Sequence, residues 1–139
     1  MLRLAFVLAV LLNTLSTRAQ DVPLKIRVLN GITGQPLKSV PVQVTVTTQM
    51  EVKTDREGLA MFTVPADATI RMTVPSLKSC SKRTPQGLLP DPKGILMPTV
   101  RLSGIVGYNA CSSHGTRSRP GEIVVYMEPR HWYRRLLPI

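Results

Sequence analysis

Residues 24–46 read LKIRVLNGITGQPLKSVPVQVTV, and their pattern is the main basis for predicting the fold. Apolar side chains occupy every second position over residues 24–28 and again over residues 40–46. Successive side chains of a strand point to opposite faces, so this period of two predicts two half-buried β-strands. The glycines and the proline within residues 30–36 predict a turn between the two strands. Pro41 has no N–H to donate to a ladder, which predicts that the second strand begins at a sheet edge or at a bulge.

The same alternation continues downstream, with turn-forming residues at intervals of about ten. It predicts strands over residues 51–53, 60–64, 70–74 and 122–127. Residues 75–94 and 104–121 are rich in Pro, Gly and Ser and predict two long loops. The apolar residues 95–103 fit either a strand or a short helical turn, since Pro98 interrupts both. Together these features predict an all-β domain built as a sandwich or small barrel.

Length and composition are those of one folded domain. The chain has 139 residues, of which 43% are hydrophobic, and this is too apolar for a disordered polyelectrolyte. Neither a Gly-x-y period, a heptad stretch nor a repeat of 20 to 50 residues is present, which excludes collagen, coiled-coil and solenoid architectures.

The N-terminus has the three-part design of a secretory signal. A basic start at Arg3 precedes the apolar residues 4–12, and a polar stretch with small residues leads to a cleavage site before Gln20. Nine apolar residues are too few for a membrane-spanning helix, so no transmembrane anchor is expected after cleavage. We therefore expect a signal peptide at 1–19, a β-sandwich domain at 20–129 and a C-terminal tail at 130–139. The predicted location is secreted or periplasmic.

The chain is basic, with 18 Lys and Arg residues against 8 Asp and Glu residues. This balance favours anionic partners through a long-range, salt-sensitive attraction. A nucleic-acid-binding protein typically has aromatic residues interspersed among its basic residues, whereas aromatic residues make up only 4% of this chain. No nucleic-acid partner is expected.

Cys80 and Cys111 are the two cysteines of the chain. In an exported protein an even cysteine count favours a disulfide, which here would tie the two predicted loops together. The alternative is a metal site in which these cysteines are joined by His114 and His131. Only Cys111 and His114 have a ligand-like spacing, so the disulfide is the stronger prediction, and we expect no metal and no cofactor.

Two motifs resemble the carboxypeptidase regulatory-like family. Residues 26–44 (IRVLNGITGQPLKSVPVQV) match its opening strand, its Thr-Gly-x-Pro-Leu turn and its valine-rich strand, and residues 54–62 (TDREGLAMF) match its second turn and the strand that follows. The residues that carry the two turns are Thr33, Gly34, Pro36, Thr54, Asp55 and Gly58. Ser39 departs from the pattern, because the family usually has Gly before the valine strand. The C-terminal stretch, including residues 104–106 and 120–124, also looks like small exported bacterial proteins that carry this domain.

The resemblance implies a single seven-stranded antiparallel β-sandwich of transthyretin-like type, related to immunoglobulin-like and starch-binding-like sandwiches. It implies no peptidase activity, because the catalytic zinc site of a carboxypeptidase belongs to a separate and larger domain. A ureide hydrolase shares the transthyretin-like fold, but its terminal Tyr-Arg-Gly-Ser signature is missing here. The chain also lacks a Gly-x-Ser-x-Gly elbow, a His-Glu-x-x-His pair and a phosphate-binding glycine loop. We therefore expect no enzyme.

The C-terminal tail is a candidate interaction segment. It combines cationic with amphipathic aromatic residues, which suit anionic headgroups and protein interfaces, in the run Arg130, His131, Trp132, Tyr133, Arg134 and Arg135. The alternative is that Trp132 and Tyr133 fold back and cap an open end of the sandwich.

The expected function is a non-catalytic exported module that interacts with a protein or a cell-envelope component. The alternative is a carbohydrate-binding module of starch-binding-like type. Sugar platforms need exposed aromatic rings, and Phe62 is expected in the core. The aromatic residues left for that role are few, namely Tyr108, Tyr126, Trp132 and Tyr133.

Overall fold

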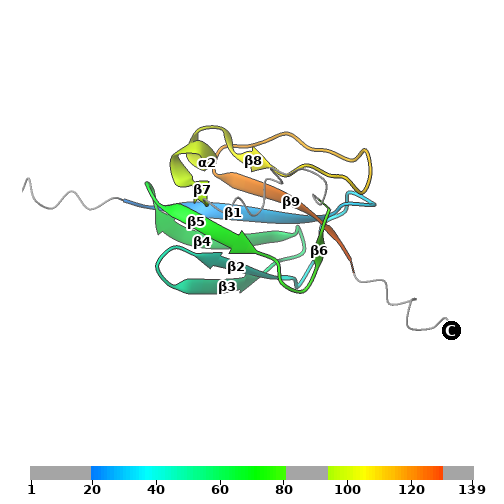
Figure 1. Cartoon of the computed structure of the whole chain (residues 1–139), viewed down its shortest axis with the longest axis horizontal. Helices are drawn as coiled ribbons and strands as arrows, with labels where there is room; N and C mark the ends of the chain where they lie inside the picture. The colour runs from blue at the N-terminus through cyan, green and yellow to red at the C-terminus, as the bar shows by residue number, and fades with distance from the viewer. Residues whose placement is uncertain (1–19, 81–93, 130–139) are drawn as a thin grey trace, which may run out of the picture.

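The computed structural model describes residues 20–80 and 94–129, which form two facing β-sheets (Figure 1). The predicted signal peptide at 1–19 and the tail at 130–139 lie outside the described residues, as does the segment 81–93. The elements are β1 Asp21–Asn30, β2 Pro41–Thr45, β3 Gln49–Lys53, β4 Leu59–Pro65, β5 Thr69–Thr73, β6 Lys78–Ser79, β7 Ile95–Leu96, α2 Met97–Ser103, β8 Ile105–Val106 and β9 Glu122–Glu128.

The first sheet has the order β4-β1-β9-β6, and β8 also pairs with β9. The second sheet has the order β3-β2-β5-β7. Most neighbours are antiparallel, but β1 and β8 both run parallel to β9. The expectation of a purely antiparallel sandwich is therefore wrong for the first sheet. The pairing of β1 with β9 joins segments that are nearly a hundred residues apart, and neither segment carries a local signal of its partner's direction.

The core lies between the sheets and follows the predicted alternation. Leu24, Ile26 and Val28 are fully buried on β1, and Val42 and Val44 are fully buried on β2. In β4 and β5 the buried and exposed residues also alternate. Burying one face of each strand removes apolar area from water, and each fully buried Val, Leu or Ile side chain contributes about 1.5–3 kcal/mol.

β9 is buried on both faces. Ile123, Val125 and Met127 face the main core, whereas Val124 and Tyr126 belong to a second, smaller cluster. This explains why its sequence is a continuous apolar run, since a strand covered on both faces needs apolar side chains at every position. The second cluster is completed by Leu29, Cys80 and Val106.

β2 lies inside its sheet, between β3 and β5, and not at an edge. Pro41 is accommodated because it is the first residue of the strand, and the pairing with β5 starts only at Gln43. The strand as a whole is therefore internal, but at Pro41, where it begins, it pairs with β3 alone, so a residue that has no N–H to donate is accommodated there.

Residues 95–103 contain both of the structures that the sequence allowed. The short strand β7 pairs with β5, and the helix α2 follows at once with Pro98 in its first turn, where the missing N–H costs nothing. Gly104, at φ 70°, ends the helix and donates its N–H to the carbonyl of Val100. The two predicted loops also contribute strands, β6 and β8, of two residues each.

Candidate functional site

The two family-like turns meet in space. Gly34 and Gly58 both have positive φ, of 76° and 74°, which only glycine adopts without strain. A Cβ on Gly58 would lie 2.6 Å from the carbonyl oxygen of Val28 and 3.1 Å from Cβ of Pro36, so this glycine allows the second turn to pack against the first. The Thr33 hydroxyl accepts a hydrogen bond from the N–H of Gln35 at 3.3 Å.

Thr54 and Asp55 stabilise the same two turns through side-chain hydrogen bonds to the backbone. The buried Thr54 hydroxyl donates to the carbonyl of Leu37 at 2.5 Å and accepts from the N–H of Val40 at 3.0 Å. Asp55 accepts from the N–H groups of Glu57 and Leu59 at 2.9 and 3.0 Å, which fixes the turn into β4. These turn residues therefore have structural roles, and they do not line either of the hollows described below.

The predicted disulfide between Cys80 and Cys111 is confirmed, with the two Cα atoms 5.4 Å apart. It connects the end of β6 to the loop after β8. The disulfide engages two of the four ligands of the alternative metal site, and the fourth, His131, lies outside the described residues. The remaining ligand, His114, lies beside Gly34, where an added Cβ would be 3.1 Å from its Nδ1 atom.

A groove of about 490 Å³, with Tyr126 in its lining, lies on the outer side of the first sheet. We call it the loop groove. It is lined by Val106, Gly107, Tyr108, Asn109, Ser112, Ser113, His114, Gly115, Thr116 and Tyr126. These side chains supply hydroxyl, amide, imidazole and phenol groups, and none of them is a carboxylate or a permanent cation. Ligand pockets typically measure about 300–1,000 Å³, so the loop groove is large enough for a small ligand.

One wall of the loop groove is firmly held. The Asn109 side-chain amide donates to the carbonyls of Gly31 and His114 at 2.8 and 3.0 Å. Ser112 donates its hydroxyl to the same Gly31 carbonyl at 2.6 Å. These bonds anchor the loop to the end of β1, and the disulfide at Cys111 anchors it to the end of β6.

The same loop also presents groups that are available for hydrogen bonding. Within the described residues, Ser113, Gly115 and Thr116 make no hydrogen bond through their backbone N–H groups. The hydroxyls of Ser113 and Thr116 add further donors and acceptors at the same place. The loop groove therefore combines a fixed wall with a row of available hydrogen-bonding groups.

Tyr126 forms the floor of the loop groove. The residue is 4% exposed, and its hydroxyl is buried with no hydrogen-bond partner among the described residues. Burial raises the pKa of this phenol above its usual value of 10.0, because the anion would lose its hydration. A buried hydroxyl without a hydrogen-bond partner is costly, so among the described residues this atom is a local penalty to stability.

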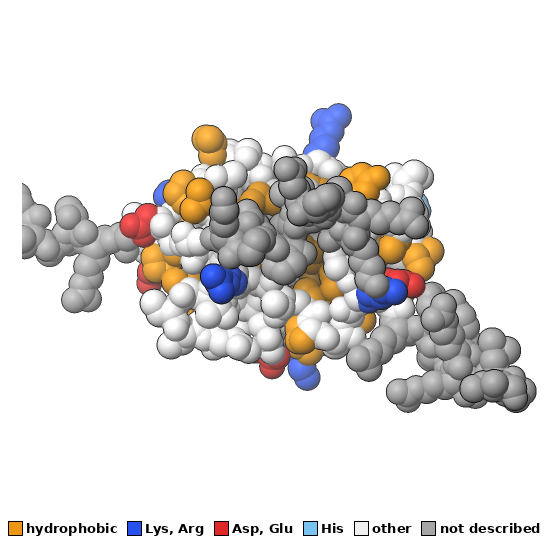
Figure 2. All heavy atoms as spheres, in the orientation of Figure 1, with side chains coloured by type: hydrophobic (Ala, Val, Ile, Leu, Met, Phe, Trp, Pro, Cys, Tyr) orange, Lys and Arg blue, Asp and Glu red, His pale blue; other side chains and the backbone are white. Residues whose placement is uncertain are grey.

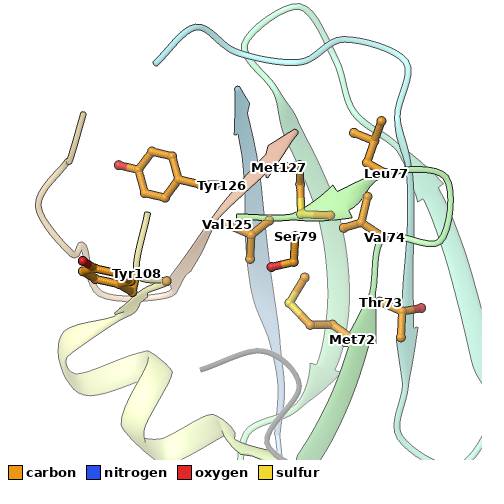
Figure 3. Close-up of a pocket in the computed structure, with 10 residues that line it drawn as sticks. Met72, Thr73, Val74, Leu77, Ser79, Tyr108, Val125, Tyr126 and Met127 are labelled. Carbon is orange, nitrogen blue, oxygen red and sulfur yellow. The ribbon is translucent and has the colours of Figure 1, made fainter. Parts of the chain in front are cut away.

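A second hollow, the apolar cavity, adjoins the loop groove. It measures about 150 Å³, and its lining includes Met72, Val74, Leu77, Val125 and Met127 from both sheets. Gly107, Tyr108 and Tyr126 line both hollows and separate them. Figure 3 shows the ring of Tyr126 pointing away from Val125 and Met127, toward the side on which Tyr108 lies.

Charge is dispersed over the described part of the molecule. Ten Lys and Arg residues stand against seven Asp and Glu residues in these ranges, a net charge of +3, so most of the excess positive charge belongs to residues outside them. On the face that Figure 2 shows, the visible Lys and Arg side chains lie at separate points and not in one patch. Arg27 and Glu122 form a bidentate ion pair, at 3.2 and 3.3 Å.

Tyr108 and Tyr126, two of the aromatic residues expected to be available for binding, both line the loop groove, which the sequence does not predict. The structure places Phe62 in the core at 5% exposure, as expected, and leaves Tyr108 58% exposed at the groove. The candidate tail, residues 130–139, lies outside the described residues.

Comparison with known proteins identifies no relative. No family model, no curated protein and no solved structure matches this chain. Among residues 20–80 and 94–129, no helix is long and apolar enough to span a bilayer.

Proposed function

We propose that this chain is a non-catalytic, exported β-sandwich module that binds a protein or a cell-envelope component. The observation that carries the proposal is the loop groove, whose lining includes a loop held by a disulfide and by side-chain hydrogen bonds. Binding sites typically consist of loops positioned by a rigid scaffold, and this arrangement has that form. The disulfide supports export, because such bonds persist in oxidising compartments.

Membership of the carboxypeptidase regulatory-like family is part of the same proposal. It is supported by the contact between the two family-like turns and by the positive φ of Ser39, where the family usually has glycine. In that family the sandwich is separate from the catalytic domain and does not itself catalyse a reaction. Turnover of an ester, peptide or ureide substrate that disappears in the His114→Ala variant would contradict the non-catalytic assignment.

The experiment is co-sedimentation of the mature protein with cell envelopes from its host. Half of the envelope preparation is first digested with protease and washed. We expect the protein to sediment with untreated envelopes. Loss of binding after digestion identifies a protein partner, whereas retention identifies a glycan or lipid component. Absence of the protein from both pellets contradicts the proposed function.

A chain ending at residue 129 separates the contribution of the tail. If the tail is the docking segment, this variant retains its thermal stability and loses sedimentation. If the tail caps the sandwich, the variant loses thermal stability.

A carbohydrate-binding module is the second candidate. It is favoured by the exposed ring of Tyr108 beside an uncharged, hydroxyl-lined groove. Aromatic rings with a polar tip suit ligands that present both apolar faces and hydroxyls.

A further inference from the structure

We propose that two copies of this chain pair through the open edges of their β4 strands, antiparallel and about a two-fold axis at Phe62, to form a dimer. The first sheets of the two copies then join into one sheet that runs from the β6 of one copy to the β6 of the other. This inference goes beyond the proposed envelope binding, since the lining of the loop groove includes no residue of β4.

The first argument is the direction of the backbone groups of β4. Among the described residues, β4 has β1 as its one neighbouring strand. In an antiparallel ladder, residues that bond to the neighbouring strand alternate with residues whose N–H and C=O groups point the other way. The N–H of Val28 bonds to the carbonyl of Gly58 at 2.8 Å, in register with this ladder. The even-numbered residues of β4 therefore bond to β1, and the odd-numbered residues point to the open edge.

Two of these odd-numbered residues have no partner on the edge. Leu59 exchanges both of its backbone groups with Asp55, and Pro65 has no N–H and accepts at its carbonyl from Ala68. The N–H and C=O groups of Met61 and Thr63 make no hydrogen bond with any other described residue. Within the described part of the chain, the edge of β4 is therefore open at these two residues.

The open groups are self-complementary. When Phe62 of one copy opposes Phe62 of the second copy, Met61 opposes Thr63, and each such pair exchanges two N–H···O=C bonds. The two copies then make four hydrogen bonds and use every open group of both edges. A register shifted by two residues would instead oppose one of the open residues to Leu59 or Pro65, whose groups are already engaged.

The second argument is that charge protects the neighbouring edge and not this one. β3 is the edge of the second sheet that lies beside β4. The N–H of Thr54 bonds to the carbonyl of Val40 in register with the β2–β3 ladder, so the odd-numbered residues of β3 point outward. They are Gln49, Glu51 and Lys53. A pairing of two β3 strands that used all three would set Glu51 against Glu51 of the second copy, which is destabilising.

β4 has no such protection. From Leu59 to Pro65 it contains no charged residue, whereas edge strands that avoid pairing usually carry charges. In the proposed register, the outer face of the joined sheet contains a row with Arg27 of one copy at one end and Asp21 of the second copy at the other. The paired strands therefore bring opposite charges, and not like charges, into the same row.

The third argument is the apolar area beside the open edge. Met61 is 48% exposed on the outer face. Met50 and Val52 pack against the main core but stay partly exposed on β3, which contacts β4 across the two sheets. A strand added to β4 would lie beside these side chains and remove part of their area from water. The contact is small, so we expect a dimer that forms and dissociates with concentration.

The test is sedimentation equilibrium of the oxidised mature protein at about 5 to 500 μM. We expect the average mass to rise from that of a monomer toward that of a dimer, with half of the chains paired at about 100 μM. The mass should rise no further, because a two-fold contact is closed.

Two variants test the edge itself. Thr63→Pro removes an N–H that the β1–β4 ladder does not use, and with it two of the four bonds of the dimer. We expect its dissociation constant to rise about tenfold or more, and Thr63→Val, which keeps the N–H, to stay within about threefold of wild type. Met61→Lys adds a charge to the edge and should weaken the dimer about tenfold. Gln49→Lys is the matched control on β3 and should leave the dimer unchanged.

Melting temperatures measured at about 5 μM, where the monomer predominates, check that each variant folds. Because Thr63→Pro and Met61→Lys alter the edge by different means, the failure of one of them to fold leaves the other as the test.

The register is tested with two further variants, Met61→Cys and Thr63→Cys. Opposed residues of a hydrogen-bonded pair have Cα atoms about 5.5 Å apart, which suits a disulfide, whereas diagonal neighbours lie about 7–8 Å apart. In the proposed register residue 61 opposes residue 63, and like positions are diagonal. A mixture of the two variants should therefore form the mixed disulfide faster than either variant forms a disulfide with itself.

A monomer mass at every concentration would overturn the inference. So would a dimer that neither Thr63→Pro nor Met61→Lys weakens, or a mass that rises beyond the dimer. Disulfides that form fastest between like positions would overturn the register. The masses are measured without envelopes, so a failure of the dimer leaves the proposed envelope binding standing, and a failure of envelope binding leaves the dimer standing.

Discussion

At the residue scale, Thr54 shows how one buried polar group connects two turns. Its hydroxyl donates to the Leu37 carbonyl and accepts from the Val40 N–H, and among the described residues neither of these backbone groups has another hydrogen bond. Replacing Thr54 by valine keeps the shape and leaves both groups unpaired. We expect Thr54→Val to lower the free energy of unfolding by about 2–4 kcal/mol, measured by urea denaturation. Thr54→Ser, which keeps the hydroxyl, should lose about 1 kcal/mol. Equal losses in both variants would contradict the assigned role.

Ser39 is the described non-glycine residue with positive φ, at 59°. An L-residue in the left-handed region is strained by about 1–2 kcal/mol, and glycine relieves this strain at some entropic cost in the unfolded chain. We expect Ser39→Gly to raise the free energy of unfolding by about 0.5–1 kcal/mol, and Ser39→Ala to leave it within about 0.5 kcal/mol of wild type. A destabilised Ser39→Gly variant would show that the serine side chain has a further role.

Because the phenol of Tyr126 is buried, we expect the free energy of unfolding to depend on pH. Its pKa in the folded protein is raised above 10.0, so the folded state keeps its phenol protonated while the unfolded chain already ionises. The free energy of unfolding is therefore unaffected by this group below pH 10. It falls as the pH rises from 10 toward the pKa of Tyr126 in the folded protein. The difference in unfolding free energy between wild type and Tyr126→Phe should therefore shift in favour of the variant above pH 10. A constant difference from pH 8 to pH 11 would contradict the burial of this hydroxyl.

At the scale of elements, the loop between β8 and β9 depends on a close approach at Gly31. A Cβ on this glycine would collide with Sγ of Cys80 and lie 2.9 Å from Oδ1 of Asn109. We expect Gly31→Ala to destabilise the protein by about 1–3 kcal/mol in thermal or urea unfolding. Gly115→Ala is the control, because no atom lies within 4 Å of its added Cβ, and it should change stability by less than about 0.5 kcal/mol.

Elements also show what sequence could and could not predict. Alternation identified β1, β2, β4 and β5, because each buries one face over five or more residues. The two-residue strands β6 and β8 were missed, since two residues cannot display a period. The loop groove was missed for a related reason: residues 106–116 have the composition of a surface loop, and their arrangement depends on Gly31, which is more than seventy residues away. The continuous apolar run of β9 did contain a signal for burial. A strand with apolar side chains at every position needs other parts of the protein packed against both of its faces.

At the scale of the whole molecule, binding should depend little on salt. The described residues carry a net charge of only +3, and the loop groove is lined by neutral groups. Screening weakens attractions between exposed charges, and the contacts available in the loop groove are hydrogen bonds and contacts with the Tyr108 ring. We expect sedimentation with envelopes to change by less than about twofold between 50 and 300 mM salt. A tenfold loss over this range would assign binding to the basic segments outside residues 20–80 and 94–129.

The central claim is that the outer face of the first sheet, beneath the loop fixed by Cys80 and Cys111, is where this module meets its partner. Hydrogen–deuterium exchange of the oxidised protein, with and without the solubilised envelope fraction that it sediments with, tests this claim without knowledge of the partner. The account predicts slowed exchange in peptides that cover residues 106–116, with β2 and β3 unchanged. Protection confined to the second sheet, with residues 106–116 exchanging as in the free protein, would contradict it.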